Sequence, residues 1–308
     1  MTLACIVVAS TLALAAQDPQ RPASPPVGAD GQLRAQPANW TQAIEPFAIA
    51  GGLYWVGSAD LSSYLFTSDA GHILIDAPLE ENVDLVLRNV EKLGFKPKDI
   101  KIVLASHGHF DHTGGMATML ERTGAQLLLS PEEAKLVGAG GKGDFFLADR
   151  AAYKPAQAAR TLRHLETVRV GDRELTAHFT PGHTRGCTSW SGTVKIAGRD
   201  RNFVSICSLT VLPGYVLAGD KPSYPGIARD YCSSVAHLRT LTPDVFLASH
   251  GSFIGLADKV AKLDAGDASA FVDPGGYEAY LDRSQQQIEK TLADQGAAGG
   301  CERVLAGN

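Results

Sequence analysis

Four side chains that can bind a metal ion lie within six residues of this chain. They are His107, His109, Asp111 and His112. Two histidines at alternate positions of an extended segment point the same way, which suits two ligands of one metal ion. Asp111 and His112 face a different direction and could hold a second ion. Imidazole and carboxylate ligands without a neighbouring thiolate favour zinc, with manganese, iron or nickel as alternatives.

The flanking sequence predicts that this cluster lies on a loop between a strand and a helix. Residues 101–106 form a short apolar run rich in β-formers, which is typical of a buried strand. Residues 113–115 (Thr-Gly-Gly) break the chain before residues 116–122, which have helical composition. Proteins of the α/β class commonly place active sites on such loops.

Two later histidines follow predicted strands and have glycine beside them. His183 lies in a Pro-Gly turn after residues 173–179, and His250 follows residues 244–248. A single histidine of this kind is more often structural than functional. Their shared position at strand ends would nevertheless bring them to one edge of a sheet. Six ligands suffice for two zinc ions with three protein ligands each, which is the open, catalytic arrangement.

The rest of the chain predicts alternating strands and helices. A strand meander followed by helix–strand units indicates an α/β fold with helices outside the sheets. The glycine-rich residues 138–143 lack the spacing of a phosphate loop and are interpreted as a loop that borders a pocket, with a plain surface loop as the alternative. The expected strands are at residues 52–56, 63–66, 72–76, 125–129, 189–194 and 202–208, and the expected helices are at 82–93, 131–136, 230–241 and, as the terminal helix, 277–292.

The composition is that of an ordinary globular protein. The chain has 308 residues, of which 44% are hydrophobic, and a formal net charge of −5. Because there is no basic stripe, nucleic-acid binding has no support. We expect a small-molecule substrate, no membrane partner and a monomer, since no oligomerisation segment is visible.

The N-terminal region has the features of an export signal. Residues 1–16 carry no charged side chain and end in Ala13-Leu14-Ala15, a small-x-small cleavage pattern. Residues 17–38 are rich in Pro, Gln, Ala and Gly, as in a linker. We therefore expect a periplasmic protein with a single domain over residues 39–308. The basic start of a signal peptide is missing, so the completeness of the N-terminus stays open.

Cysteine usage agrees with export. Four cysteines remain after the signal peptide: Cys187, Cys207, Cys232 and Cys301. An even number in an exported protein fits disulfide bonds, for which three connectivities are possible. Four free thiols are the alternative if the chain stays in the cytosol.

The residues above resemble those of the metallo-β-lactamase superfamily. The shared features are Asp76 after an apolar strand, the His-x-His-x-Asp-His block from His107 to His112, Pro-Gly-His183 and the late His250. The resemblance runs from about Trp40 to Tyr280. It implies an αββα sandwich, in which two mixed sheets face each other, helices lie outside and the metals bind at one edge.

Within the superfamily the chain resembles the subclass B3 β-lactamases. Residues 205–211 carry no carboxylate, whereas thiolesterases of the glyoxalase II type and other binuclear hydrolases have a bridging Asp there. Residues 183–190, 208–215 and 224–231 are also similar to subclass B3. The resemblance implies two zinc ions. The first would be bound by His107, His109 and His183, and the second by Asp111, His112 and His250.

The resemblance also implies roles for other residues. Ser208 and Thr210 would bind the substrate carboxylate, with ordinary structural hydroxyls as the alternative, and Asp76 would position the histidine loop. Tyr215 and Phe145 would line the pocket or belong to the core. Some members have a disulfide at the positions of Cys187 and Cys207, which would leave Cys207 unavailable as a metal ligand. Cys232 would then pair with Cys301.

The activity implied by the resemblance is zinc-dependent hydrolysis of the β-lactam ring amide of penicillins, cephalosporins and carbapenems, and hence antibiotic resistance. Zinc lowers the pKa of bound water towards ~7, and Asp111 would orient the attacking oxygen. Two alternatives stay open. One is an exported hydrolase of a lactone or thioester, and the other is a non-catalytic metal-binding member of the fold.

Overall fold

The computed structural model describes residue 28 and residues 33–307. The predicted signal peptide and most of the predicted linker lie outside these residues. Within the described part of the chain, no helix is both long and apolar enough to cross a membrane.

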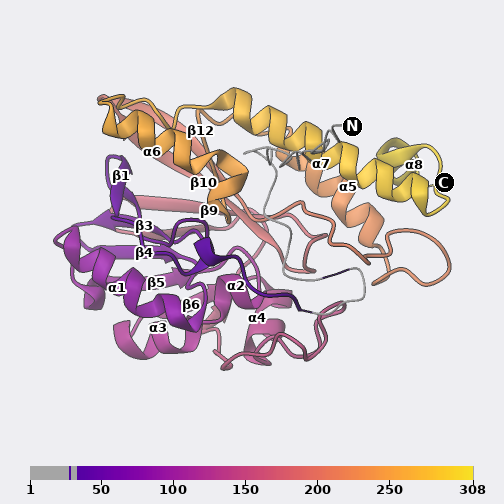
Figure 1. Cartoon of the computed structure of the whole chain (residues 1–308), viewed down its shortest axis with the longest axis horizontal. Coiled ribbons are helices and arrows are strands. Elements are labelled where there is room, and N and C mark those ends of the chain that lie inside the picture. The colour runs from indigo at the N-terminus through magenta and orange to yellow at the C-terminus, as the bar shows by residue number, and fades with distance from the viewer. Residues whose placement is uncertain (1–27, 29–32, 308) are drawn as a thin grey trace, which may run out of the picture.

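The strands form two mixed sheets, one of seven strands and one of five, with helices on the outer face of each (Figure 1). In the larger sheet, the N-terminal four strands are antiparallel, which confirms the predicted meander, and the following strands are added in parallel. This sheet consists, in spatial order, of β1 (Phe47–Ala50), β2 (Leu53–Trp55), β3 (Tyr64–Ser68), β4 (Gly71–Ile75), β5 (Ile100–Leu104), β6 (Gln126–Leu129) and β7 (Arg160–Thr161).

Helices in the connections between the parallel strands cover this sheet. Val86 and Val90 of one helix are buried against Leu74 and Val103 of the sheet, as the apolar periodicity predicts. The helical segments of this half are η1 (Ala38–Trp40), η2 (Glu80–Asn82), α1 (Val83–Lys92), η3 (Pro97–Asp99), α2 (Phe110–Thr113), α3 (Met116–Thr123) and α4 (Pro131–Gly138).

The smaller sheet is antiparallel except for its last pair, in which β11 and β12 run parallel. Its strands, in spatial order, are β12 (Val245–Ala248), β11 (Arg199–Ile206), β10 (Thr188–Ile196), β9 (Arg173–Phe179) and β8 (Thr167–Val170). The helical segments of this half are α5 (Ile227–Leu238), η4 (Gly251–Ile254), α6 (Leu256–Asp264), α7 (Pro274–Asp294) and α8 (Gly300–Ala306).

Two expectations about this half were wrong. The helix expected at 277–292 is not the terminal helix, because α8 follows it and is tied to α5 by the disulfide between Cys232 and Cys301. Helix α6 was not expected at all. Short helices such as α6 and α8 have weak local signals and depend on tertiary packing for their stability.

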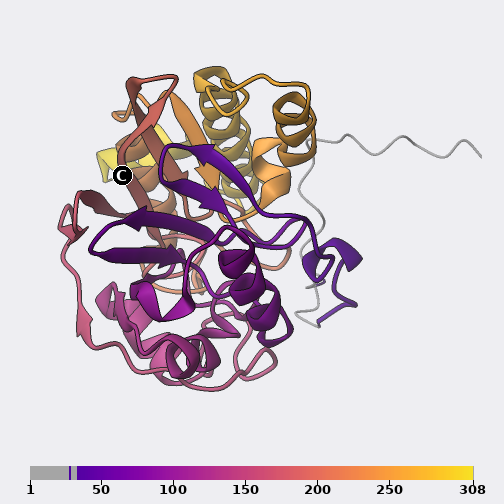
Figure 2. The same ribbon diagram turned by 90° about the vertical axis from the view of Figure 1, so that its left-hand side faces the viewer.

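The two sheets pack face to face and enclose most of the hydrophobic core. Phe66 of β3 and Phe203 of β11 meet across the interface with ring centroids 5.1 Å apart. Figure 1 shows α1 and α3 on one outside and α5 and α7 on the other, and Figure 2 shows the same stacking from the side. The predicted αββα sandwich, with two facing mixed sheets and helices outside, is therefore confirmed.

Buried side-chain hydrogen bonds join the two sheets close to the histidine loop. The Trp190 indole N–H donates to Ala105 O at 3.1 Å, and the Tyr64 hydroxyl donates to Ala248 O at 2.8 Å. Ala105 directly follows β5, which leads to His107, and Ala248 ends β12, which leads to His250. These buried contacts therefore fix the two ligand-bearing edges relative to each other.

Candidate metal centre

The histidine loop leaves the larger sheet at the end of β5. His107 and His109 are in the extended part of this loop, and His109 is the residue that precedes α2. Asp111 and His112 belong to the single turn of α2, where we expected a loop throughout. From this helical turn, Asp111 and His112 offer donor atoms that lie within 4.8 Å of a ring nitrogen of His107.

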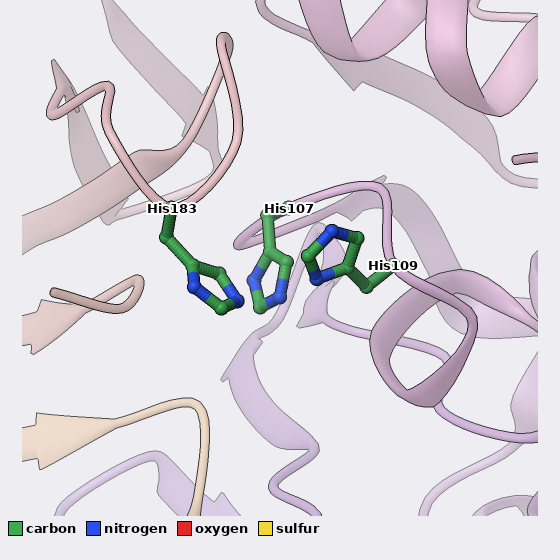
Figure 3. Close-up of side chains that lie close together, drawn as sticks. All are labelled: His107, His109 and His183. Atoms are coloured by element: carbon green, nitrogen blue, oxygen red, sulfur yellow. The ribbon is translucent and has the colours of Figure 1, made fainter. Parts of the chain in front are cut away.

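Three imidazoles from the two sheets converge on one point. His107 and His109 come from the loop after β5, and His183 comes from the turn after β9 in the other sheet. Figure 3 shows the three rings pointing toward one another. One nitrogen of each ring lies within 4.8 Å of the others, and all three side chains are buried. We call these residues the first donor group.

A second set of side chains converges beside the first. His112 Nε2 lies 3.2 Å from His250 Nε2, and Asp111 Oδ2 lies 3.5 Å from the former and 3.6 Å from the latter. His250 follows β12, so this set also joins the two sheets. His107 lies between the sets, since its ring centroid is 4.2 Å from that of His112. We call Asp111, His112 and His250 the second donor group.

The ring nitrogens that face away from the convergence points have polar neighbours. Such an arrangement selects the tautomer and leaves the other nitrogen free to bind a metal, as is usual for metal-binding histidines. The neighbours are Ser106 Oγ for His107 (3.2 Å), Asp144 Oδ2 for His109 (3.6 Å), Asp76 Oδ2 for His112 (3.4 Å), Thr210 O for His183 (2.8 Å) and Asp60 Oδ2 for His250 (3.0 Å). The donor atoms and their orientation fit zinc ions.

The titratable side chains of the donor groups are buried close together, and this shifts their pKa values in different directions. Burial lowers the pKa of His112, but Asp111 and Asp76 outweigh this and raise it to about 10. Burial and the neighbouring His109 lower the pKa of His183 to about 3. Burial opposes ionisation of Asp111, yet His112 and His250 hold its pKa well below the usual range. The first donor group thus offers neutral His183, and the second offers an ionised carboxylate.

Asp76 connects the end of β4 to the histidine loop. Its backbone is left-handed, with φ of 66°, a conformation that is uncommon for non-glycine residues. Its carboxylate accepts hydrogen bonds from Ser106 N at 2.6 Å and from Ser106 Oγ at 2.8 Å. Asp76 therefore contacts the loop and the outer nitrogen of His112, which is the positioning role we expected.

Two carboxylates at the site were missed by sequence reasoning. Asp60, from the loop between β2 and β3, contacts His250, and Asp144, from the loop after α4, contacts His109. Asp144 is buried, and although burial opposes its ionisation, the hydrogen bond to His109 brings its pKa to about 2. Neither residue has a recognisable motif around it, so only the folded chain reveals them.

The residues expected to bind the substrate lie next to the first donor group. Ser208 is buried, and its hydroxyl accepts a hydrogen bond from Thr210 N at 3.2 Å. Thr210 is partly exposed, and its carbonyl accepts from His183. The structure therefore gives both residues local structural contacts, and Thr210 has the more accessible side chain.

The aromatic residues expected near the site pack together. The Phe145 ring lies 5.1 Å from the Tyr215 ring, and the buried Tyr215 hydroxyl donates to His183 O at 2.8 Å. Phe145 also lines a cleft together with Lys142, Gly143 and Arg185. Of the glycine-rich residues 138–143, Lys142 and Gly143 therefore border this cleft.

The cysteines near the site are not free thiols. Cys187 and Cys207 form a disulfide, with Cα atoms 5.9 Å apart. Cys207 Sγ lies 3.6 Å from His107 Nδ1, the ring nitrogen that faces away from the donor groups. Because both cysteines are bonded to each other, the donor set consists of imidazole and carboxylate.

An αββα sandwich with two adjacent groups of buried imidazole and carboxylate donors, at the edge where both sheets end, defines a metal-binding hydrolase. Comparison with known proteins makes the class specific. The family model "Metallo-beta-lactamase superfamily" matches residues 60–250. The chain belongs to this superfamily.

Solved structures extend the likeness beyond the matched region. The metallo-β-lactamase FEZ-1 from Legionella gormanii is 38% identical, with a TM-score of 0.82 over 84% of this chain and 99% of that one. BJP-1 from Bradyrhizobium japonicum, a subclass B3 metallo-β-lactamase, is 34% identical, with a TM-score of 0.78 over 85% of this chain and 98% of that one. The structure is therefore strongly similar to those of subclass B3 enzymes, and the chain is a hydrolase.

Curated relatives by sequence are more distant and include other hydrolases. A hydroxyacylglutathione hydrolase from Anaeromyxobacter dehalogenans is 33% identical over 135 residues, which are 43% of this chain and 43% of that protein. The chain spans about half the length of several curated relatives that it matches.

Proposed function

We propose that this protein hydrolyses the β-lactam ring amide of penicillins, cephalosporins and carbapenems with two zinc ions, and thereby gives antibiotic resistance. The observation that carries this proposal is the likeness to subclass B3 enzymes over almost their whole length, at 34–38% identity. The two donor groups supply the residues that such chemistry requires.

The first donor group would hold one zinc ion and the second donor group the other. When bound, zinc supplies Lewis acidity, which activates water and polarises a carbonyl oxygen. The polar neighbours of the outer histidine nitrogens would support each ring in the orientation that metal binding requires.

Asp111 would act on the attacking water as well as on the metal. Its carboxylate is ionised at neutral pH, because His112 and His250 hold its pKa well below the usual range. An ionised carboxylate can accept a hydrogen bond from a water molecule and so orient its lone pair towards the substrate carbonyl. We assign this orienting role to Asp111 and no covalent step to any side chain.

The substrate would be oriented by its own carboxylate. Ser208 and Thr210 lie on the segment that also supplies the carbonyl partner of His183. Thr210 is the better placed of the two, since its side chain is partly exposed while Ser208 is buried. Binding there would place the β-lactam carbonyl near both donor groups.

We further propose that the protein is a periplasmic monomer. Its two disulfides are stable in an oxidising compartment. The composition of residues 1–16 supports an export signal, and β-lactam antibiotics act in the same compartment.

A thioester or lactone substrate is the second candidate, favoured by the hydroxyacylglutathione hydrolase among the relatives. The test is a parallel assay of purified, zinc-loaded protein on nitrocefin, benzylpenicillin and a carbapenem, and on a homoserine lactone and S-lactoylglutathione. We expect turnover of the β-lactams that is abolished by EDTA. Turnover of the lactone or thioester without any of the β-lactams would overturn the proposal.

A further inference from the structure

Glu133 is a buried carboxyl group that the chemistry above does not use. It lies in the first turn of α4, is 1% exposed and does not belong to either donor group. Burying a carboxyl group costs free energy, and apolar residues of similar volume are often at least as stable at such positions. Packing alone therefore does not explain why a carboxyl group lies at this buried position.

One oxygen of Glu133 contacts the loop that carries His183. The Thr184 hydroxyl donates a hydrogen bond to Glu133 Oε1. Thr184 directly follows His183 and is itself 1% exposed. This bond therefore ties the start of α4 to one ligand of the first donor group.

The other oxygen contacts the loop that carries His107 and His109. A Cβ atom at Gly108 would lie 2.5 Å from Glu133 Oε2 and 2.9 Å from Leu136 Cδ2. Without a side chain, Gly108 therefore lets the Glu133 carboxyl group and Leu136 lie against the His107–His109 loop.

The residue that caps the N-terminus of α4 makes a second contact with the His183 loop. Ser130 accepts a hydrogen bond from Glu133 N and donates one to Gly186 O at 2.7 Å. A Cβ atom at Gly186 would lie 2.5 Å from Ser130 Oγ. The turn of α4 that presents Glu133 is thus itself docked against the His183 loop.

We propose that Glu133 is a positioning residue of the first donor group, whose carboxyl group sets the distance between the His107–His109 loop and the His183 loop. The inference rests on the proposed zinc site. It predicts that metal affinity depends on Glu133 although Glu133 does not bind the metal. Residues that orient metal ligands typically change metal affinity 10–100-fold when they are replaced.

The test measures zinc affinity at the first donor group alone. A His250→Ala background leaves the second donor group incomplete, so one bound zinc ion reports on the first. In that background we expect Glu133→Ala to weaken zinc binding by about 10–100-fold in competition with a chelator. The matched control is Glu132→Ala, because Glu132 is the adjacent residue on α4 and its carboxylate faces Lys135 at the surface. This control should bind zinc within about twofold of its parent.

Thr184 provides an independent pair of variants. Thr184→Ser keeps the hydroxyl and should bind zinc as its parent does, whereas Thr184→Val removes the hydrogen bond and should weaken binding. If both residues act through one contact, Thr184→Val should lower zinc affinity less in the Glu133→Ala variant than it does by itself. The visible spectrum of the cobalt-substituted protein should change for Thr184→Val but not for Thr184→Ser.

Zinc affinities of Glu133→Ala and Thr184→Val equal to that of the Glu132→Ala control would overturn the inference. If Glu133→Ala does not fold, as judged by circular dichroism, the Thr184 pair decides. A background protein that binds no zinc at all would instead contradict the proposed function, so the two failures are distinguishable.

Discussion

His250 Nδ1 lies 3.0 Å from Asp60 Oδ2, which joins two residues 190 positions apart in the chain. The second oxygen of Asp60 accepts a hydrogen bond from Ser252 N at 2.7 Å, so the carboxylate is held on both sides. This contact places the proton of His250 on Nδ1. The ring therefore presents the lone pair of Nε2 to Asp111 and His112.

Replacing Asp60 should weaken the second zinc site. Asp60→Asn keeps the shape but loses the charge that orients His250, so we expect a 10–100-fold lower affinity for the second zinc ion. The measurement is zinc content after dialysis against zinc buffers. Asp69→Asn is the control, because Asp69 is exposed in the turn between β3 and β4. Equal zinc retention by the two variants would contradict this role.

Zinc should stabilise the fold in proportion to the number of ions bound. Above the dissociation constant, each tenfold rise in free zinc adds about 1.4 kcal/mol per site to the free energy of unfolding. Two sites predict a slope of about 2.7 kcal/mol per decade, and His250→Ala should reduce it to about 1.4. Urea unfolding in zinc buffers measures the slope. A slope of about 1.4 for the unaltered protein would mean that only one ion binds.

The two disulfides should contribute unequally to stability. Cys187 and Cys207 are 20 positions apart in the chain, whereas Cys232 and Cys301 are 69 positions apart. Loop-closure entropy predicts that the free energy of unfolding falls by about 3 kcal/mol when serines replace Cys187 and Cys207, and by about 4 kcal/mol when they replace Cys232 and Cys301. Guanidinium unfolding of metal-free protein compares them without changes in metal binding. A larger loss for the shorter loop would show that chain entropy does not dominate.

Acid should destabilise the metal-free protein partly through His178 of β9, which belongs to neither donor group and contacts His237 and Ser191. Burial and the charges of His237 and His164 lower the pKa of His178 to about 4. The unfolded chain takes up this proton near pH 6.5, so this contribution is present above pH 6.5 and is lost as the pH falls towards 4.

The comparison is between the unaltered protein and His178→Gln, both without metal. From pH 7.5 to 4.5 the free energy of unfolding of the unaltered protein should fall by about 1–2 kcal/mol more than that of the variant. This figure is reduced for partial solvent screening. Urea unfolding at the two pH values measures this difference. Parallel pH curves would show that His178 does not titrate in this range.

Most of the strand and helix positions near the histidine loop could be predicted from local sequence. The apolar run before His107 and the glycines after Thr113 are short-range signals of a strand and of a break. In contrast, α6 and α8 were missed or misplaced, because both helices are short and α8 is held by a disulfide to α5. Boundaries also shifted where packing decides them, as for α5, which begins at Ile227 and not at residue 230.

Local sequence predicts the donor types, the spacing from His107 to His112 and the strand ends that carry His183 and His250, because residue identity and short-range periodicity encode them. It does not predict which side chains face the outer nitrogens of these histidines, because that depends on how the chain folds. Asp60, Asp144 and the inferred contact of Glu133 with Gly108 join segments that are far apart in the chain. Such contacts arise when two sheets pack against each other, and no local pattern in the sequence records that packing.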